Sequence, residues 1–265
     1  MTADGWAKAV RQQLGLGRVL PLGGPRDGAW ITERAAGSFL RRAAASVPGV
    51  RPGPLRISPA DPDASYESYE PVVPPPPSAL PPGPLRIDAD FEVSADPTAL
   101  AAEPLHATAA RLRAVLATAA TERLGLTVTE VDLRVTGLLE ADEDMGGVRP
   151  ENGPPAGEPA PAREPERGGD GGDGGGDGDD EESRVTATAL AVPGVARLTG
   201  VLGGRGRSVH IETGAALPRR HVRVELAVTA TATERVLDVA RAVRAAVGGA
   251  LPDHPSVAVV VTEVD

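Results

Sequence analysis

The sequence predicts an α+β fold of two small modules, each a three-stranded sheet with helices packed on one face, joined by a disordered acidic Gly/Asp/Pro linker. Three observations lead to this prediction. The pentapeptide VTEVD occurs at residues 128–132 and again at 261–265. The same order of helical and strand patterns precedes each copy, which is the signature of a divergent tandem duplication. A segment almost without apolar side chains separates the two sets.

The charge of the chain is concentrated in that separating segment. Residues 140–182 contain 15 acidic and 3 basic residues, a net charge of −12, which leaves +2 for the rest of a chain whose total is −10. Such a segment cannot bury enough surface to offset its ordering entropy, so we interpret it as disordered. The predicted domains are, in order, an N-terminal segment with a short helix (1–28), a first module (29–140) with a proline-rich insertion (59–81), the acidic linker (141–183) and a second module (184–265).

The composition limits the class of protein. Only 2% of the 265 residues are aromatic, so the core must be built from Val, Leu, Ile and Ala. The absence of cysteine excludes disulfides, thiolate metal sites and cysteine nucleophiles. Lys8 is the only lysine among 27 basic residues, a bias typical of a bacterial gene with high GC content. No apolar stretch fits a signal peptide or a membrane span, so we expect a soluble, cytoplasmic protein.

The first module begins with a helical pattern after Thr32, a residue type that caps helices. This helix should end at Ser46 or Val47, because the following proline cannot continue it. The motif PGPLRI, at 52–57 and again at 82–87, predicts the two strands of a hairpin. A second helix and a last strand (126–135) complete the module. The apolar stripe of that second helix is expected to be Leu105, Ala109, Leu112, Leu116 and Ala119.

The proline-rich insertion (59–81) separates the two strands of this hairpin. Its four consecutive prolines, 74–77, force a polyproline II conformation and exclude a central strand. Both tyrosines of the chain, Tyr66 and Tyr69, lie here. We interpret the insertion as an exposed spacer, with a PxxP ligand for an SH3-like or WW-like groove as the alternative.

The second module repeats this order. A helical pattern ends at Pro193, two alternating strand patterns follow, and a long helix is expected to begin at an N-cap on Thr233. The last strand spans 257–265. The buried face of the long helix is expected to be Val236, Val239, Ala240, Val243 and Val247.

This second module resembles the alkaline shock protein and Gls envelope stress response family of bacteria. The resemblance is carried, in order, by ATALAVPGVARLTGVLGG, SVHIE, HVRVELAVTA, ERVLDVARAVRAAV and SVAVVVTEV, and in the first module by ITERAAGSFLRRAAASVPGV. It departs from the family in a Gly-rich turn compressed to GGRGRS and in the proline-rich insertion. We attribute a second similarity, of actinobacterial proteins of this shape to a baculoviral (nucleopolyhedrovirus) fibre-protein family, to composition alone.

The resemblance implies a role in the envelope stress response at the inner face of the cytoplasmic membrane. It implies attachment there through a protein partner, either a membrane anchor or a paralogous family member, and it allows self-association. Contact with the membrane itself is expected to be peripheral only.

No pattern of catalytic residues is present. The sequence has no G-x-S-x-G, no P-loop and no G-x-G-x-x-G after a strand, so we expect no enzymatic activity and no cofactor. His210 and His221 could meet across a hairpin with Glu212 around a metal ion, but histidines flanking strands are more often surface residues. We therefore expect no metal.

The candidate binding residues are five arginines around the hairpin of the second module, which carries 10 basic and 7 acidic residues. They are Arg205, Arg207, Arg219, Arg220 and Arg223. We interpret them as a solvated rim, and the alternative is a surface for an anionic lipid, nucleic acid or acidic protein. We expect the tethered acidic linker to compete with any external anion.

The sequence therefore predicts a non-catalytic scaffold or interaction protein of the envelope stress type. The alternative is anionic-surface or nucleic-acid binding, because helix, two strands, helix and strand also resemble part of a type II KH module. That module requires a G-x-x-G between two helices, which is absent, and the second module has no Phe, Trp or Tyr to stack on bases. We therefore do not expect nucleic acid as a partner.

Overall fold

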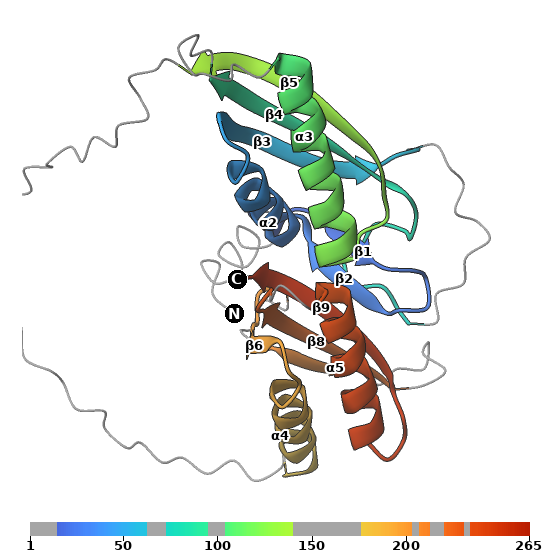
Figure 1. Cartoon of the computed structure of the whole chain (residues 1–265). Coiled ribbons are helices and arrows are strands. Elements are labelled where there is room, and N and C mark those ends of the chain that lie inside the picture. The colour runs from blue at the N-terminus through green and yellow to red at the C-terminus, as the bar shows by residue number, and fades with distance from the viewer. Residues whose placement is uncertain are drawn as a thin grey trace, which may run out of the picture.

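The computed structural model describes residues 15–62, 73–94, 104–139, 176–202, 207–212, 220–230 and 234–265. These residues form the predicted α+β fold, with four α-helices and two sheets (Figure 1). The strands are β1 (Val19–Leu22), β2 (Ala29–Thr32), β3 (Val50–Pro59), β4 (Leu85–Ser94), β5 (Val128–Leu139), β6 (Val195–Leu198), β7 (Val209–Glu212), β8 (His221–Val228) and β9 (Ser256–Val264). The helices are α2 (Glu33–Ala45), α3 (Leu105–Thr118), which continues as a π-helical segment η1 (Ala119–Leu124), α4 (Gly176–Leu190) and α5 (Val236–Ala250).

The first repeat has the predicted helix and three-stranded sheet. Thr32 caps α2, since its Oγ1 accepts a hydrogen bond from the amide of Ala35 at 3.3 Å, and the helix ends at a C-cap on Ser46 as expected. The first PGPLRI motif lies within β3 and the second leads into β4, and these strands pair in antiparallel orientation with Ile57 opposite Ile87. Helix α3 then crosses over to β5, which pairs with β4 in parallel. Of the predicted stripe on this helix, Leu105 is exposed, while Leu112 and Leu116 are buried.

The second repeat has the same connectivity. β6 and β7 pair with β8 in antiparallel orientation, and α5 crosses over to β9, which runs parallel to β8. The predicted apolar face of α5 is buried. Its N-cap is Arg235, without a side-chain cap, instead of Thr233, which lies outside the described residues.

The V-P-G-V motif occupies equivalent positions in the two repeats. In each, it joins the first helix to the first strand through a glycine with positive φ, 71° at Gly49 and 87° at Gly194. The carbonyl of each glycine accepts a hydrogen bond from the end of the neighbouring strand, from Ser94 at 2.8 Å and from Thr229 at 2.9 Å. The repeated VTEVD differs, because it begins β5 but ends at the close of β9. The V-P-G-V turn, and not the pentapeptide, marks the structural repeat.

The prediction of a separate three-stranded sheet in each half holds for the first half alone. The second sheet has six strands, in the order β1-β2-β9-β8-β6 with β7 also on β8. β2 pairs in parallel with β9, Ala29 opposite Val259 and Ile31 opposite Val261. The predicted boundary after residue 28 therefore separates β1 from β2, although these two strands pair with each other. Both are short and buried along their whole length, so they lack the alternation by which strands are recognised.

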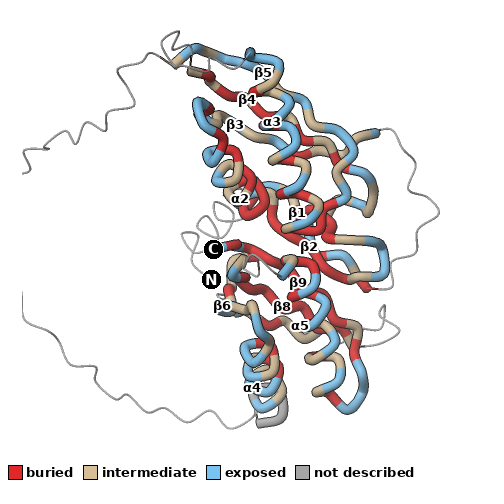
Figure 2. The backbone as a smooth tube through the Cα atoms, in the orientation of Figure 1, coloured by how far each residue is buried: buried red, intermediate tan, exposed pale blue. Residues whose placement is uncertain are grey.

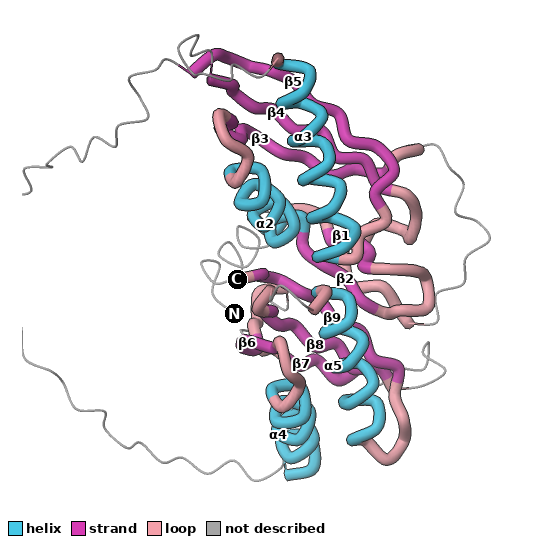
Figure 3. The backbone as a smooth tube through the Cα atoms, viewed as in Figure 1, coloured by secondary structure: helices cyan, strands magenta, loops and turns pink. Residues whose placement is uncertain are grey.

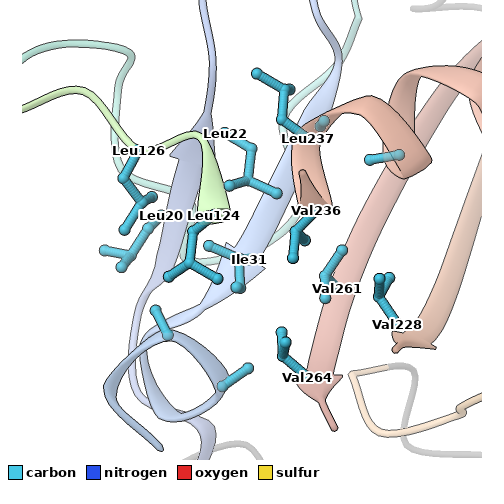
Figure 4. Close-up of a cluster of buried hydrophobic side chains, with 14 of the residues drawn as sticks. Leu20, Leu22, Ile31, Leu124, Leu126, Val228, Val236, Leu237, Val261 and Val264 are labelled. Atoms are coloured by element: carbon cyan, nitrogen blue, oxygen red, sulfur yellow. The ribbon is translucent and has the colours of Figure 1, made fainter. Parts of the chain in front are cut away.

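Buried side chains of both repeats form one continuous core. Leu20, Leu22 and Ile31 from β1 and β2 lie between Leu124 of the first repeat and Val236 and Val261 of the second (Figure 4). Helix α2 packs against β3 of one sheet and β9 of the other. The four helices thus cover the same side of both sheets (Figure 3).

Part of the proline-rich insertion (59–81) packs on the protein, so its interpretation as an exposed spacer is wrong for the buried and hydrogen-bonded positions among residues 73–81. The backbone of Val19 in β1 donates to Ser78 O at 3.2 Å and accepts from Leu80 N at 2.8 Å. Val73 is 2% exposed and packs beside Trp30. Tyr66 and Tyr69 lie outside the described residues.

The predicted linker (141–183) is too long at its C-terminal end. Helix α4 begins at Gly176 and includes the last acidic residues of the segment. Acidic side chains in the first turns of a helix interact favourably with its dipole, an effect that composition alone does not reveal. Residues 140–175 lie outside the described part of the chain.

The two V-P-G-V glycines provide a matched test of the repeat. A Cβ at Gly49 would lie at an ordinary 3.5 Å from the Cβ of Ser94, whereas one at Gly194 would lie 2.7 Å from Cγ2 of Val239. We expect Gly49→Ala to lower the free energy of unfolding by about 1 kcal/mol, through positive φ alone. Gly194→Ala should cost at least about 1 kcal/mol more, because it also overpacks the core. Urea unfolding measures both, and equal costs would contradict the described packing.

Candidate functional site

The predicted arginine cluster lies where α4 meets the start of β8. Arg220 donates to Glu181 of α4 at 2.6 Å and to Asp253 at 2.8 Å, and its side chain is only 19% exposed. These two hydrogen bonds raise the pKa of the Arg220 guanidinium, and the hydrogen bond to Glu181 has the larger effect. Arg220 is therefore a structural bridge between α4 and the turn before β9.

The other described arginines of the cluster also face carboxylates. Arg207 Nη1 lies 3.9 Å from Glu182 of α4. Arg223, with a side chain 11% exposed, has Nη1 at 3.8 Å from Glu212. Two acidic residues from the end of the predicted linker, Glu181 and Glu182, thus face two arginines of the cluster.

Arg205 and Arg219 lie outside the described residues. The structure therefore brings Arg207, Arg220 and Arg223 to one region, but with intramolecular partners for each. Neither a solvated rim nor a free anion-binding surface describes Arg220 and Arg223.

A buried carboxylate, Glu225 of β8, lies next to this cluster and was not predicted as a site residue. It is 0% exposed, and its Oε2 accepts hydrogen bonds from the amides of Val201 at 2.7 Å and Leu202 at 2.8 Å. Its Oε1 lies 3.6 Å from His210 Nε2 and 3.8 Å from Arg223 Nε. These three atoms are buried without a hydrogen bond to the described residues.

Along the edge of β8, Glu225 lies between the stretch that pairs with β6 and the stretch that pairs with β7. The amide of Thr199 donates to its carbonyl, and its own amide donates to Ser208 O. Its backbone and carboxylate therefore hold both ends of the loop that includes Arg205. The sequence signal for this site is the alternation in HVRVELAV, which places Glu225 on the same strand face as His221 and Arg223.

The histidines do not form the metal site considered from the sequence. His221 Nδ1 lies 3.0 Å from Ser256 Oγ, while His210 faces Glu225. Burial lowers the pKa of His221. Across the described residues, no group of three His, Asp or Glu side chains could hold a metal ion.

A second polar surface lies on the three-stranded sheet, on the side opposite the helices. Arg134 of β5 forms a bidentate pair with Asp90 of β4, at 2.9 and 2.7 Å, which lowers the pKa of Asp90. Arg86 lies 3.1 Å from Asp88 and 2.9 Å from Asp132. Apart from Asp90, whose side chain is 21% exposed, these side chains are 41–74% exposed, and together they form a ladder across β4 and β5.

An apolar cavity of about 250 Å³ lies between the β1–β2 hairpin and the proline-rich insertion. Pro21, Trp30, Val73 and Leu80 contribute to its lining. It is built from the insertion that has no counterpart in the second repeat.

Neither a protein-family model, nor a curated protein, nor a solved structure matches this chain. The resemblance to the alkaline shock and Gls family thus stays a prediction. In the ranges that the structure describes, every helix is too short or too polar to cross a membrane.

The role of Glu225 can be tested against an exposed glutamate of the same sheet. Glu225→Ala should lower the free energy of unfolding by about 3 kcal/mol or more, because it leaves two loop amides without their acceptor and removes the carboxylate that faces the buried Arg223. Glu263→Ala removes a 48% exposed partner of Arg197 and should cost at most about 1 kcal/mol. Urea unfolding of both variants measures the difference, and similar values would refute the anchoring role of Glu225.

Proposed function

We propose that this protein is a non-catalytic scaffold or interaction protein that binds protein partners along β5, the open edge of the three-stranded sheet. β5 is the last strand in the order β3-β4-β5, and no described strand pairs with its outer edge. It is long, with exposed Val135 (39%) and Leu138 (67%). Unpaired backbone groups on such an edge are a ready template for a further strand.

The other edges of the two sheets are protected, which makes β5 exceptional among the described strands. β3 contains Pro52, Pro54 and Pro59 and an irregular register, and Arg18 donates to its Ile57 carbonyl at 2.8 Å. The insertion covers β1, and β6 and β7 have four residues each. Prolines, bulges, coverage and short length are the devices that keep sheet edges from pairing.

The strands of the two repeats also differ in how far they are buried. β8 and β9 are buried almost throughout, whereas β5 is exposed along most of its length (Figure 2). The first repeat therefore offers a surface to a partner while the second serves as its structural support.

The proposal includes a role of the envelope stress type at the cytoplasmic face of the membrane, through a membrane anchor or a paralogous protein. What supports it is the repeated helix, V-P-G-V turn and β-β-α-β unit, together with the residues that resemble that family. The alternative, binding of an anionic surface or nucleic acid by the arginine cluster, is disfavoured because Arg207, Arg220 and Arg223 face carboxylates of the same chain.

Partner capture tests the proposal. The tagged full chain is incubated with detergent-solubilised membranes of the bacterium that encodes it, and bound proteins are identified by mass spectrometry. The double variant Val135→Lys, Leu138→Lys adds two charges along the open edge and should reduce capture of the specific partner about tenfold or more.

The matched control is the double variant Ala187→Lys, Leu190→Lys. Both residues are exposed on α4, which packs on α5, β6 and β7 in the second repeat. The control should capture the partner as well as the unchanged chain does. Equal capture by both double variants would contradict partner binding along β5.

A further inference from the structure

We infer that one occupant of the β5 edge is a second copy of this chain, paired in antiparallel orientation about Leu133. This inference rests on the proposed function in taking the β5 edge as the binding surface. Pairing would join two three-stranded sheets into one continuous sheet of six strands. The argument for self-pairing comes from the charges and apolar residues along β5.

Centring the pair on Leu133 makes the two strands complementary. Asp132 of one copy then lies opposite Arg134 of the other, and by symmetry this contact occurs twice. Val131 lies opposite Val135, and Leu133 opposite itself. Directly opposite residues in antiparallel strands interact most strongly, and opposite charges or paired apolar side chains both stabilise the pair.

Neighbouring registers are unfavourable. A slip of one residue would place the apolar side chains of one copy and the charged side chains of the other on the same face of the joined sheet, because successive side chains point to opposite faces. Slips of two residues would centre the pair on Asp132 or on Arg134, and each would set two like charges opposite each other at the centre. Centring on Asp132 would also place Glu130 opposite Arg134, but the register centred on Leu133 is the one that gives opposite charges without a like-charge pair.

The two faces of β5 are already separated in the way that a continuous sheet requires. Val131 and Leu133 pack against the core on the helix side. Asp132 and Arg134 lie on the other side, with Arg86 and Asp90 of β4 as neighbours. Their side chains are 58% and 74% exposed, so both can contact a second copy. Self-pairing would extend the charge ladder across the interface.

Antiparallel pairing also separates the acidic segments. The segment 140–182, with its net charge of −12, follows directly after β5. In a pair centred on Leu133 the two Leu139 residues lie at opposite ends, about 40 Å apart at the usual rise per residue. That separation exceeds the Debye length of about 8 Å at physiological salt. A parallel pair would bring the two segments together.

One side chain lies on the path of a second strand. Arg113 of α3 donates to the carbonyl of Val131 at 3.1 Å. This contact is exposed, and a carbonyl has two lone pairs, so it can accept from a second strand or exchange one donor for another.

The test is the association of the purified full chain, measured by sedimentation in the ultracentrifuge. An interface of one strand edge is small, so we expect a monomer–dimer equilibrium with a dissociation constant of roughly 10 μM. Asp132→Arg and Arg134→Asp should each raise this constant about tenfold or more, because each places like charges opposite one another twice. The double swap Asp132→Arg, Arg134→Asp should restore dimerisation.

The double swap separates the interface from the fold. Both single variants and the double swap disrupt the pairs with Arg86 and Asp90 inside one copy, so a purely structural effect would not be rescued. An equimolar mixture of the two single variants should also dimerise, since each is complementary to the other in this register. Circular dichroism confirms that every variant is folded.

A chain that stays monomeric throughout, or a dimer that the single variants do not weaken, would overturn the inference. A double swap that fails to rescue dimerisation would overturn the register and the inference with it. The proposed function would survive any of these results if partner capture is still lost in Val135→Lys, Leu138→Lys. Conversely, rescue by the double swap without specific partner capture would uphold self-pairing and refute the wider function.

Discussion

The parallel pairing of β2 with β9 is the contact on which the arrangement of the two repeats depends. It places a hairpin that precedes α2 at the outer edge of the last strand of the chain. Ile31 and Val261 then face the same core, and α2 packs on strands of both sheets. Without this pairing β9 would be an open edge, and the apolar side chains of β1 and β2 would lose their contact with the second sheet.

A consequence is that the two repeats have diverged in what covers their sheets. On the side away from the helices, Ala258 and Val260 of the second sheet are buried with Trp30 and Val73. The corresponding side of the first sheet carries exposed pairs such as Arg134 with Asp90. This asymmetry supports the proposal that β5 is the binding strand.

Much of the local structure could be predicted because its signals are local. Thr32 caps α2, proline ends it, and the 3.6-residue stripe of α5 is the face that is buried. The repeated order of elements could also be predicted, although VTEVD misplaced its register. The V-P-G-V motif marks equivalent positions in the two repeats because a turn with positive φ needs glycine. A Val-rich strand, in contrast, can hold the same pentapeptide at different positions along its length.

The features that could not be predicted depend on contacts between distant segments. β1 and β2 are buried on both faces, so periodicity gave no strand signal. Glu225 follows the alternation of an exposed strand face and is nevertheless 0% exposed, because the loop after β6 folds over it. The same holds for the arginine cluster, whose acidic partners in α4 lay in a segment interpreted as disordered.

The most direct test of a shared fold is to cut the chain between the repeats. A specific protease site is inserted between residues 150 and 165, and the cleaved protein is passed over a sizing column without denaturant. Because β2 pairs with β9 and both repeats contribute to one core, the two fragments should elute together and unfold in a single cooperative transition. Fragments that separate and unfold independently would show that each repeat is its own domain, and would contradict the shared sheet.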